Sequence, residues 1–207
     1  MKISWKSTNY GQTGFHIDQL GEYDATPPVD ALLLDRAPRT LNPERQAIAA
    51  YLAFSPWISG ELQLPQRLGP NTATAIERDL AHVQVRPAPV EYYPKPLEVG
   101  LREVSVVLDE LGHSGSGAFI NVVRASEWAG SLRGLQSIAV SSNAFALDAG
   151  ASSETPSIRA RLAVAVLFAG EIAADVLILP EDLVLSDAEL NSLRSLLLAA
   201  RLGLKIA

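Results

Sequence analysis

The chain has 207 residues, of which 48% are hydrophobic and 19% charged, and it contains no cysteine. The absence of cysteine excludes disulfide bonds, thiolate metal sites and a cysteine nucleophile. Seventeen lysine and arginine residues against 23 aspartate and glutamate residues give a formal net charge of −6. Because proteins that wrap duplex nucleic acid usually carry a basic excess, this balance argues against broad nucleic-acid binding.

The sequence predicts neither secretion nor membrane insertion. Residues 1–10 contain no apolar run of the signal-peptide type. The longest uncharged stretch that holds an apolar helix, residues 46–60, contains Pro56 and is shorter than the roughly 20 residues that span a bilayer. We therefore expect no membrane association and a cytoplasmic location.

The N-terminal part predicts a mixture of strands and helices. Asn42 and Pro43 form a typical helix start, with the asparagine as N-cap and the proline at the first helical position. The expected elements, in chain order, are strand 30–34, helix 43–55, strand 61–64, helix 72–82 and strand 83–85. The sequence leaves open whether they join the sheet of the C-terminal part.

Residues 86–96 contain four of the thirteen prolines. Proline lacks a backbone N–H and favours extended backbone in the residue before it. We expect an extended connector or an edge strand here. It would form a subdomain seam within a single α/β domain that covers residues 1–207.

The C-terminal part predicts strands that alternate with helices. Residues 103–109 and 174–179 are apolar and β-branched, as expected of strands, and residues 186–189 form a capping box that begins a helix. The expected elements are strands 103–109, 136–140, 174–179 and 204–206, and helices from Thr155 and from Ser186. This alternation predicts an α/β fold. A mainly parallel sheet with flanking helices forms its C-terminal half, and an α+β N-terminal portion packs against that half.

One candidate ligand loop follows the strand at 103–109. It consists of Gly112, His113, Ser114, Gly115, Ser116 and Gly117. If a helix begins near Ala118, its amino end and the loop amides would face an anion. The loop matches neither the Walker pattern nor the dinucleotide fingerprint, and an ordinary connection explains it as well.

The first five residues of this loop also resemble the G-x-S-x-G nucleophile elbow of α/β-hydrolases, with Ser116 in place of the last glycine. In that family the serine needs a histidine that comes later in the chain. All three histidines, His16, His82 and His113, precede Ser114. We therefore do not expect a serine hydrolase.

Carboxylates at the ends of apolar strands form a second candidate site. They are Asp35, Asp109, Glu181 and Asp182. If their strands are parallel neighbours, the carboxyl ends meet at one sheet edge, where several carboxylates would suit Mg²⁺ and a phosphate-bearing substrate. Acidic residues are also common in solvated loops, so this pattern alone does not establish a metal site.

Residues 134–153 carry a single charge, Asp148, and are consistent with a loop, a lid or an oligomer contact. Within them, Ser141, Ser142 and Asn143 follow a strand and could bind a polar ligand or form an ordinary turn.

Two classes of function follow from the sequence. The first is an accessory protein that acts through contacts with a protein partner or with itself, because no catalytic constellation is present. The alternative is an enzyme or binder for a small anionic or nucleotide-like ligand. It would use residues 112–117 and the strand-end carboxylates, with Mg²⁺ as a candidate cofactor.

Overall fold

The computed structural model describes residues 1–79, 83–94, 96–108, 117–127, 134, 136–151 and 157–207, which contain ten strands and five α-helices. The strands are β1 (Lys2–Ser7), β2 (Thr13–Gln19), β3 (Ala31–Leu34), β4 (Gly60–Leu68), β5 (Val85–Val90), β6 (Arg102–Leu108), β7 (Phe119–Arg124), β8 (Ser137–Ser142), β9 (Ala174–Leu179) and β10 (Gly203–Ile206). The helices are α1 (Pro43–Phe54), α2 (Pro70–Asp79), α3 (Ala144–Ala151), α4 (Arg159–Phe168) and α5 (Asp187–Ala199).

All ten strands belong to one mixed sheet, in the order β10-β9-β6-β7-β8-β3-β2-β1-β4-β5. The strands from β6 to β10 are parallel to one another, whereas β1, β2 and β3 form an antiparallel meander. At the centre, β3 runs antiparallel to β8. The protein is therefore an α/β protein, as predicted, and the N-terminal strands join the C-terminal sheet.

The two halves of the chain repeat one order of elements. The first half runs β1-β2-β3-α1-β4-α2-β5, and the second runs β6-β7-β8-α4-β9-α5-β10 with α3 added before α4. In each half the strands lie across the sheet in the order third, second, first, fourth, fifth. The direction of one strand differs, because β2 is antiparallel to its neighbours and β7 is parallel to its own.

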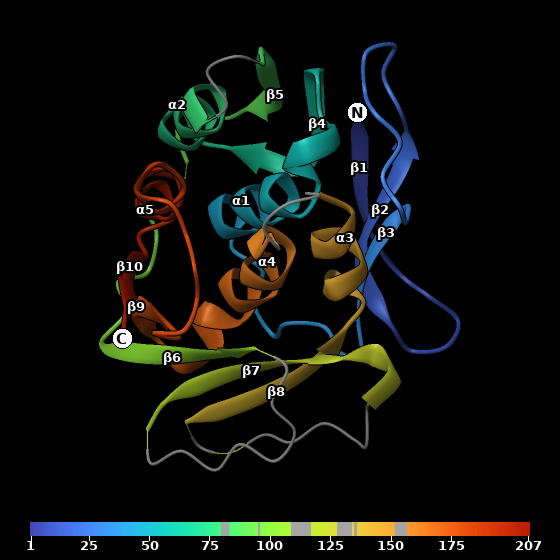
Figure 1. The fold of residues 1–207 in the computed structure, drawn as a ribbon. Helices are drawn as coiled ribbons and strands as arrows, with labels where there is room; N and C mark the ends of the chain where they lie inside the picture. Colours follow the sequence, from blue (N-terminus) through green and yellow to red (C-terminus); the bar gives the residue numbers. More distant parts are fainter. Residues whose placement is uncertain (80–82, 95, 109–116, 128–133, 135, 152–156) are drawn as a thin grey trace.

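The sheet curls around the two central helices, α1 and α4 (Figure 1). In this view β4 and β5 lie above these helices, β1–β3 to the right, β6–β8 below, and β9 and β10 to the left. Equivalent helices of the two halves pack in pairs, α1 on α4 and α2 on α5. The core therefore lies inside the curled sheet and includes both halves.

The central helices are buried on nearly all sides, because the sheet surrounds them. From Ala47 to Phe54 every residue of α1 is buried, and so are nine of the ten residues of α4. Both helices are rich in alanine, whose small side chain lets two helices approach closely. A helix that is apolar all round is expected only in such a position.

Several predicted elements are confirmed. Strand 174–179 is β9 to the residue, and the capping box begins α5, where the Ser186 hydroxyl accepts from Glu189 N. Asn42 caps α1 as expected. Residues 85–90 form β5 at one edge of the sheet, which agrees with the expected edge strand.

Other predictions were wrong or incomplete. The helix expected near Ala118 is the strand β7, and the low-charge segment 134–153 contains the whole of β8 and helix α3. Strands β1 and β2 were not predicted. Thr155 and Pro156, expected to begin a helix, lie outside the described residues.

Among the described residues, no helix is both long and apolar enough to span a membrane.

Candidate functional site

Most of the predicted glycine loop lies outside the described residues, which include only its last member, Gly117. Gly117 is exposed and is followed by Ala118 and the strand β7. Because a strand follows instead of a helix, no helix amino end is available there to attract an anion.

The predicted carboxylates do not converge in the part of the chain that is described. Asp35 follows β3, whereas Glu181 and Asp182 follow β9, and three strands lie between β3 and β9. The described residues contain no group of three acidic or histidine side chains that could hold a metal, and Asp109 lies outside them.

Asp35, Ser142 and Asn143 instead join the two halves of the sheet. The Asp35 carboxylate accepts from Ser141 N at 3.0 Å, and the Ser142 hydroxyl donates to Leu33 O at 2.8 Å. The Asn143 amide accepts from Leu33 N at 2.7 Å and donates to the Ala31 carbonyl at 2.9 Å. These side chains supplement the single ladder pair between β3 and β8.

Asp35 also borders a cavity of about 550 Å³ beside this junction. Its Oδ2 atom is buried and has no hydrogen-bond partner within the described ranges, and burial raises the pKa of its carboxyl group. The hydrogen bond from Ser141 N opposes this rise in pKa. Asp35 is thus a partly desolvated carboxylate that contributes to the junction through one of its oxygens.

A larger set of unpartnered polar atoms lies at the amino end of α1. A cavity of about 590 Å³, called the α1 cavity below, is bounded by residues 40–46, by Gln66 and Arg67 of β4, and by the segment after β5. Leu167 and Gly170, from the end of α4 and the turn after it, complete the wall. The cavity therefore lies between the two halves, near the carboxyl ends of β4 and β5. Open α/β sheets commonly bind ligands at such ends.

The first turn of α1 is held by its own side chains. Asn42 Oδ1 accepts from Glu44 N at 2.9 Å and from Arg45 N at 3.3 Å. The Glu44 carboxylate in turn accepts from Gly69 N at 2.8 and 3.0 Å. Because these groups already have partners, the amino end of α1 contributes its dipole to the cavity but few free amides.

Arg45 and Gln46, the next two residues, are nearly enclosed by protein, with 6% and 1% of their surfaces exposed. Arg45 Nη2 and both polar atoms of the Gln46 amide are buried without a hydrogen-bond partner. The only hydrogen bond of the Arg45 side chain among the described residues runs from Nε to Ala200 O at 3.4 Å. Three donor or acceptor atoms of these two side chains therefore lack a partner in the part of the chain that the structure describes.

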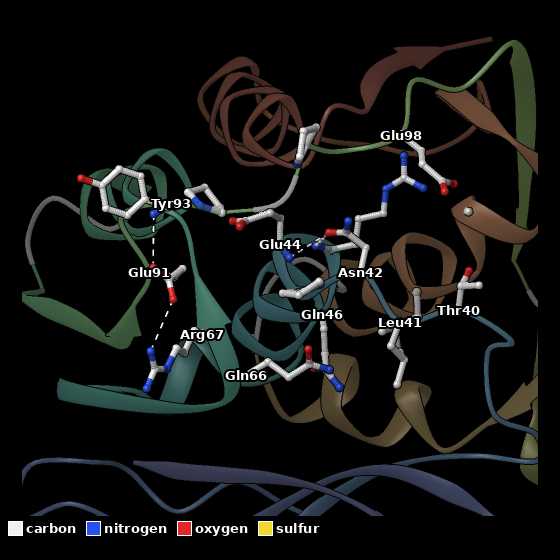
Figure 2. Close-up of a pocket in the computed structure, with 16 residues that line it drawn as sticks. Thr40, Leu41, Asn42, Glu44, Gln46, Gln66, Arg67, Glu91, Tyr93 and Glu98 are labelled. Atoms are coloured by element: carbon white, nitrogen blue, oxygen red, sulfur yellow. Dashed lines mark hydrogen bonds and ion pairs between the residues drawn. The ribbon is translucent and has the colours of Figure 1, made fainter.

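The charge around Arg45 has both signs. Burial lowers the pKa of its guanidinium, while the carboxylates of Glu98 and Asp175 oppose that change. At the rim, Arg67 pairs with Glu91 at 3.4 Å, and Glu91 also accepts from Tyr93 N at 3.2 Å. Figure 2 shows Glu98 at one side of the cavity and the Arg67–Glu91–Tyr93 chain at the other.

Sequence reasoning missed Arg45 and Gln46. The available signal was a charged residue and an amide directly before the apolar run 47–54. Polar residues in a first helical turn are ordinarily solvated, so the pattern alone does not distinguish them. Their burial comes from the second half of the chain, which the local sequence does not specify.

The chain matches no protein-family model, and neither the curated proteins nor the solved structures include a significant match.

Proposed function

We propose that this protein is a binding protein that holds the anionic group of a small ligand in the α1 cavity. The observation that carries the proposal is the buried guanidinium of Arg45, whose Nη2 atom has no acceptor among the described residues. Buried polar groups are almost always hydrogen-bonded, and a buried charge without an anion is costly. A bound anion would supply the missing acceptor.

The composition of the cavity wall supports binding more than covalent catalysis. Its described lining contains no serine and no histidine, the usual nucleophile and base of covalent catalysis. The volume of about 590 Å³ lies within the range of small-molecule sites. A ligand there would contact both halves of the chain, because the wall includes residues of α1 and Leu167 of α4.

Thermal unfolding with inorganic phosphate and with acetate, each at constant ionic strength, tests the proposal. We expect at least one anion to raise the Tm of the wild-type protein saturably, and Arg45→Met to abolish the rise. Arg102→Met, the same change at an exposed arginine outside the cavity, is the control and should keep the rise. A ligand at 100 times its Kd stabilises the folded state by about 2.7 kcal/mol. No saturable rise with either anion would contradict the proposal.

Action through a protein partner is a second candidate function, favoured by a different observation. The segment between β5 and β6 exposes four large apolar side chains, those of Tyr92, Tyr93, Val99 and Leu101. Aromatic residues are enriched in protein interfaces. Size-exclusion chromatography with light scattering tests the self-association arm. If the wild type and a Tyr92→Ser/Tyr93→Ser variant both have the molar mass of a monomer, self-association is excluded. A cytoplasmic location is part of both candidates, and the cysteine-free composition supports it.

A further inference from the structure

The central helices of the two halves carry an arginine at the same place. Arg45 is the third residue of α1, and Arg161 is the third residue of α4. In both helices the backbone N–H groups of the second and third residues donate to one side chain. Asn42 accepts both bonds in α1, and Asp148 accepts both in α4.

In the second half this arginine holds a carboxylate. Arg161 Nε donates to Asp148 Oδ2 at 2.7 Å, and Ala160 N donates to Asp148 Oδ1 at 2.8 Å. Asp148 is buried, and it belongs to α3. The amino end of α4 is therefore closed by a carboxylate from within the protein.

In the first half no carboxylate closes the equivalent position. No helix equivalent to α3 precedes α1, because residues 35–42 form an irregular segment. Asn42 takes the two backbone N–H bonds but is a neutral amide, and no carboxylate among the described residues lies within ion-pair distance of Arg45. The α1 cavity lies at the amino end of α1, where the second half of the chain has the Asp148 carboxylate at the amino end of α4.

We propose that the α1 cavity takes a free amino acid or a similar zwitterion, whose carboxylate binds Arg45 and whose ammonium group faces Glu98. This inference rests on the proposed function and names the class of its ligand. The carboxylate of the ligand would pair with Arg45 as the carboxylate of Asp148 pairs with Arg161. A planar guanidinium suits a carboxylate because two of its N–H groups can donate in parallel.

The charges on the wall favour a zwitterion over a phosphate. The described lining holds two cations, Arg45 and Arg67, and three anions, Glu44, Glu91 and Glu98. A phosphate with nearly two negative charges would be repelled by these glutamates, whereas a single carboxylate is repelled less. Glu44 and Glu91 already have partners. Glu98 is exposed and lies near Arg45, so it is the carboxylate available to an ammonium group.

Calorimetric titration of the whole chain with four probes tests this inference. The probes are glutamine, acetate, methylammonium and inorganic phosphate, all at the same ionic strength. We expect glutamine to bind more tightly than acetate, and methylammonium and phosphate not to bind. Arg45→Met should weaken glutamine binding by about tenfold or more, because a hydrogen bond to a charged group contributes about 1.5–3 kcal/mol.

Two further variants separate the parts of the ligand. Glu98→Gln should weaken glutamine binding without weakening acetate binding, because it removes only the partner of the ammonium group. Arg45→Lys keeps the charge but not the planar fork, so it should weaken both. Arg102→Met is again the control and should change neither affinity.

The outcomes separate this inference from the proposed function. Saturable binding of phosphate or acetate without a preference for glutamine would overturn the amino-acid assignment and leave the anion-binding function standing. No binding of any anionic or zwitterionic probe would overturn both. Glutamine binding that Arg45→Met leaves unchanged would overturn the assignment of the α1 cavity.

Discussion

The two halves of the chain share one order of strands and helices, but they close the amino end of the central helix in different ways. In the second half, Asp148 from α3 satisfies Arg161. In the first half, Arg45 occupies the same helical position beside a cavity of about 590 Å³. The two halves therefore share the same packing of strands and helices. They differ in whether the arginine at the third position of the central helix has a carboxylate partner.

The comparison indicates which buried arginines stabilise the fold and which one is available to a ligand. A buried arginine with a carboxylate partner belongs to the structure, and removal of either member leaves an uncompensated charge. A buried arginine without a carboxylate partner costs free energy in the folded state, and an anion supplied by another molecule would offset that cost. The predictions below test this distinction.

The largest effect is expected for Arg159, which connects the two halves. Its guanidinium pairs with Asp79 at 2.6 Å and with Glu189 at 2.7 Å. Asp79 also accepts from the hydroxyls of Tyr51 and Ser192. We expect Arg159→Met to lower the free energy of unfolding by about 4 kcal/mol, because it leaves Asp79 buried without a cation.

Urea unfolding followed by circular dichroism measures this change, with Arg102→Met as the control. A loss smaller than about 1 kcal/mol, the size expected of a surface pair, would show that the network contributes little to the contact between the halves.

A somewhat smaller loss is expected at Arg161. Arg161→Met removes the cation that faces the buried Asp148, although the bonds from Ala160 N and Arg161 N remain. We expect a loss of about 3 kcal/mol in the same urea experiment. Asp148→Asn/Arg161→Met, in which both charges are absent, should recover much of that loss. No recovery would show that packing, and not the uncompensated charge, causes the effect.

The opposite sign is expected at Arg45, which is the sharpest test of the comparison. Arg45→Met removes a desolvated charge and one hydrogen bond of 3.4 Å. We expect the free energy of unfolding without ligand to rise by about 1 kcal/mol. A loss of stability equal to that of Arg161→Met would mean that Arg45 is a structural arginine like its counterpart.

The smallest effect is a pH dependence at Asp35, at the junction of the halves. Burial raises the pKa of its carboxyl group above the ordinary value of an aspartate, so the folded state binds this proton at a higher pH than the unfolded state does. Stability of the wild type should therefore rise, relative to Asp35→Asn, as the pH falls from neutral through the folded pKa. The rise should level off below the unfolded pKa. Urea midpoints of both proteins across this pH range measure the difference, and parallel curves would contradict it.

Local sequence signals were sufficient to predict the helices whose first residues carry a capping motif. Asn42 with Pro43 and the capping box at 186–189 predicted the starts of α1 and α5 because capping depends on a few adjacent residues. The β-branched run of β6 was likewise predicted. Strands β1 and β2 were missed because their polar residues face solvent along an antiparallel hairpin, and β7 was missed because the preceding glycines suggested a helix start.

The candidate site was not predictable from local patterns. Asp35 was chosen as a metal ligand because it follows a strand, but that strand is antiparallel to β8 and separated from β9 by three others. Arg45 and Gln46 were not chosen because polar residues in the first turn of a helix are ordinarily solvated, even directly before an apolar run. Leu167, Gly170 and Ala200, which enclose them, come more than 120 residues later in the chain.

The sequence by itself determined the α/β class, the absence of thiol chemistry and the positions of capped helices, because composition, periodicity and capping act over a few residues. Only the tertiary structure decided that the halves repeat one order, that they meet at β3 and β8, and that Arg45 is buried with no ion-pair partner among the described residues. Strand pairing and the desolvation of a charge depend on residues far apart in the chain. The local sequence therefore predicts features that arise from adjacent residues, and it does not predict features that arise from contacts between distant parts of the chain.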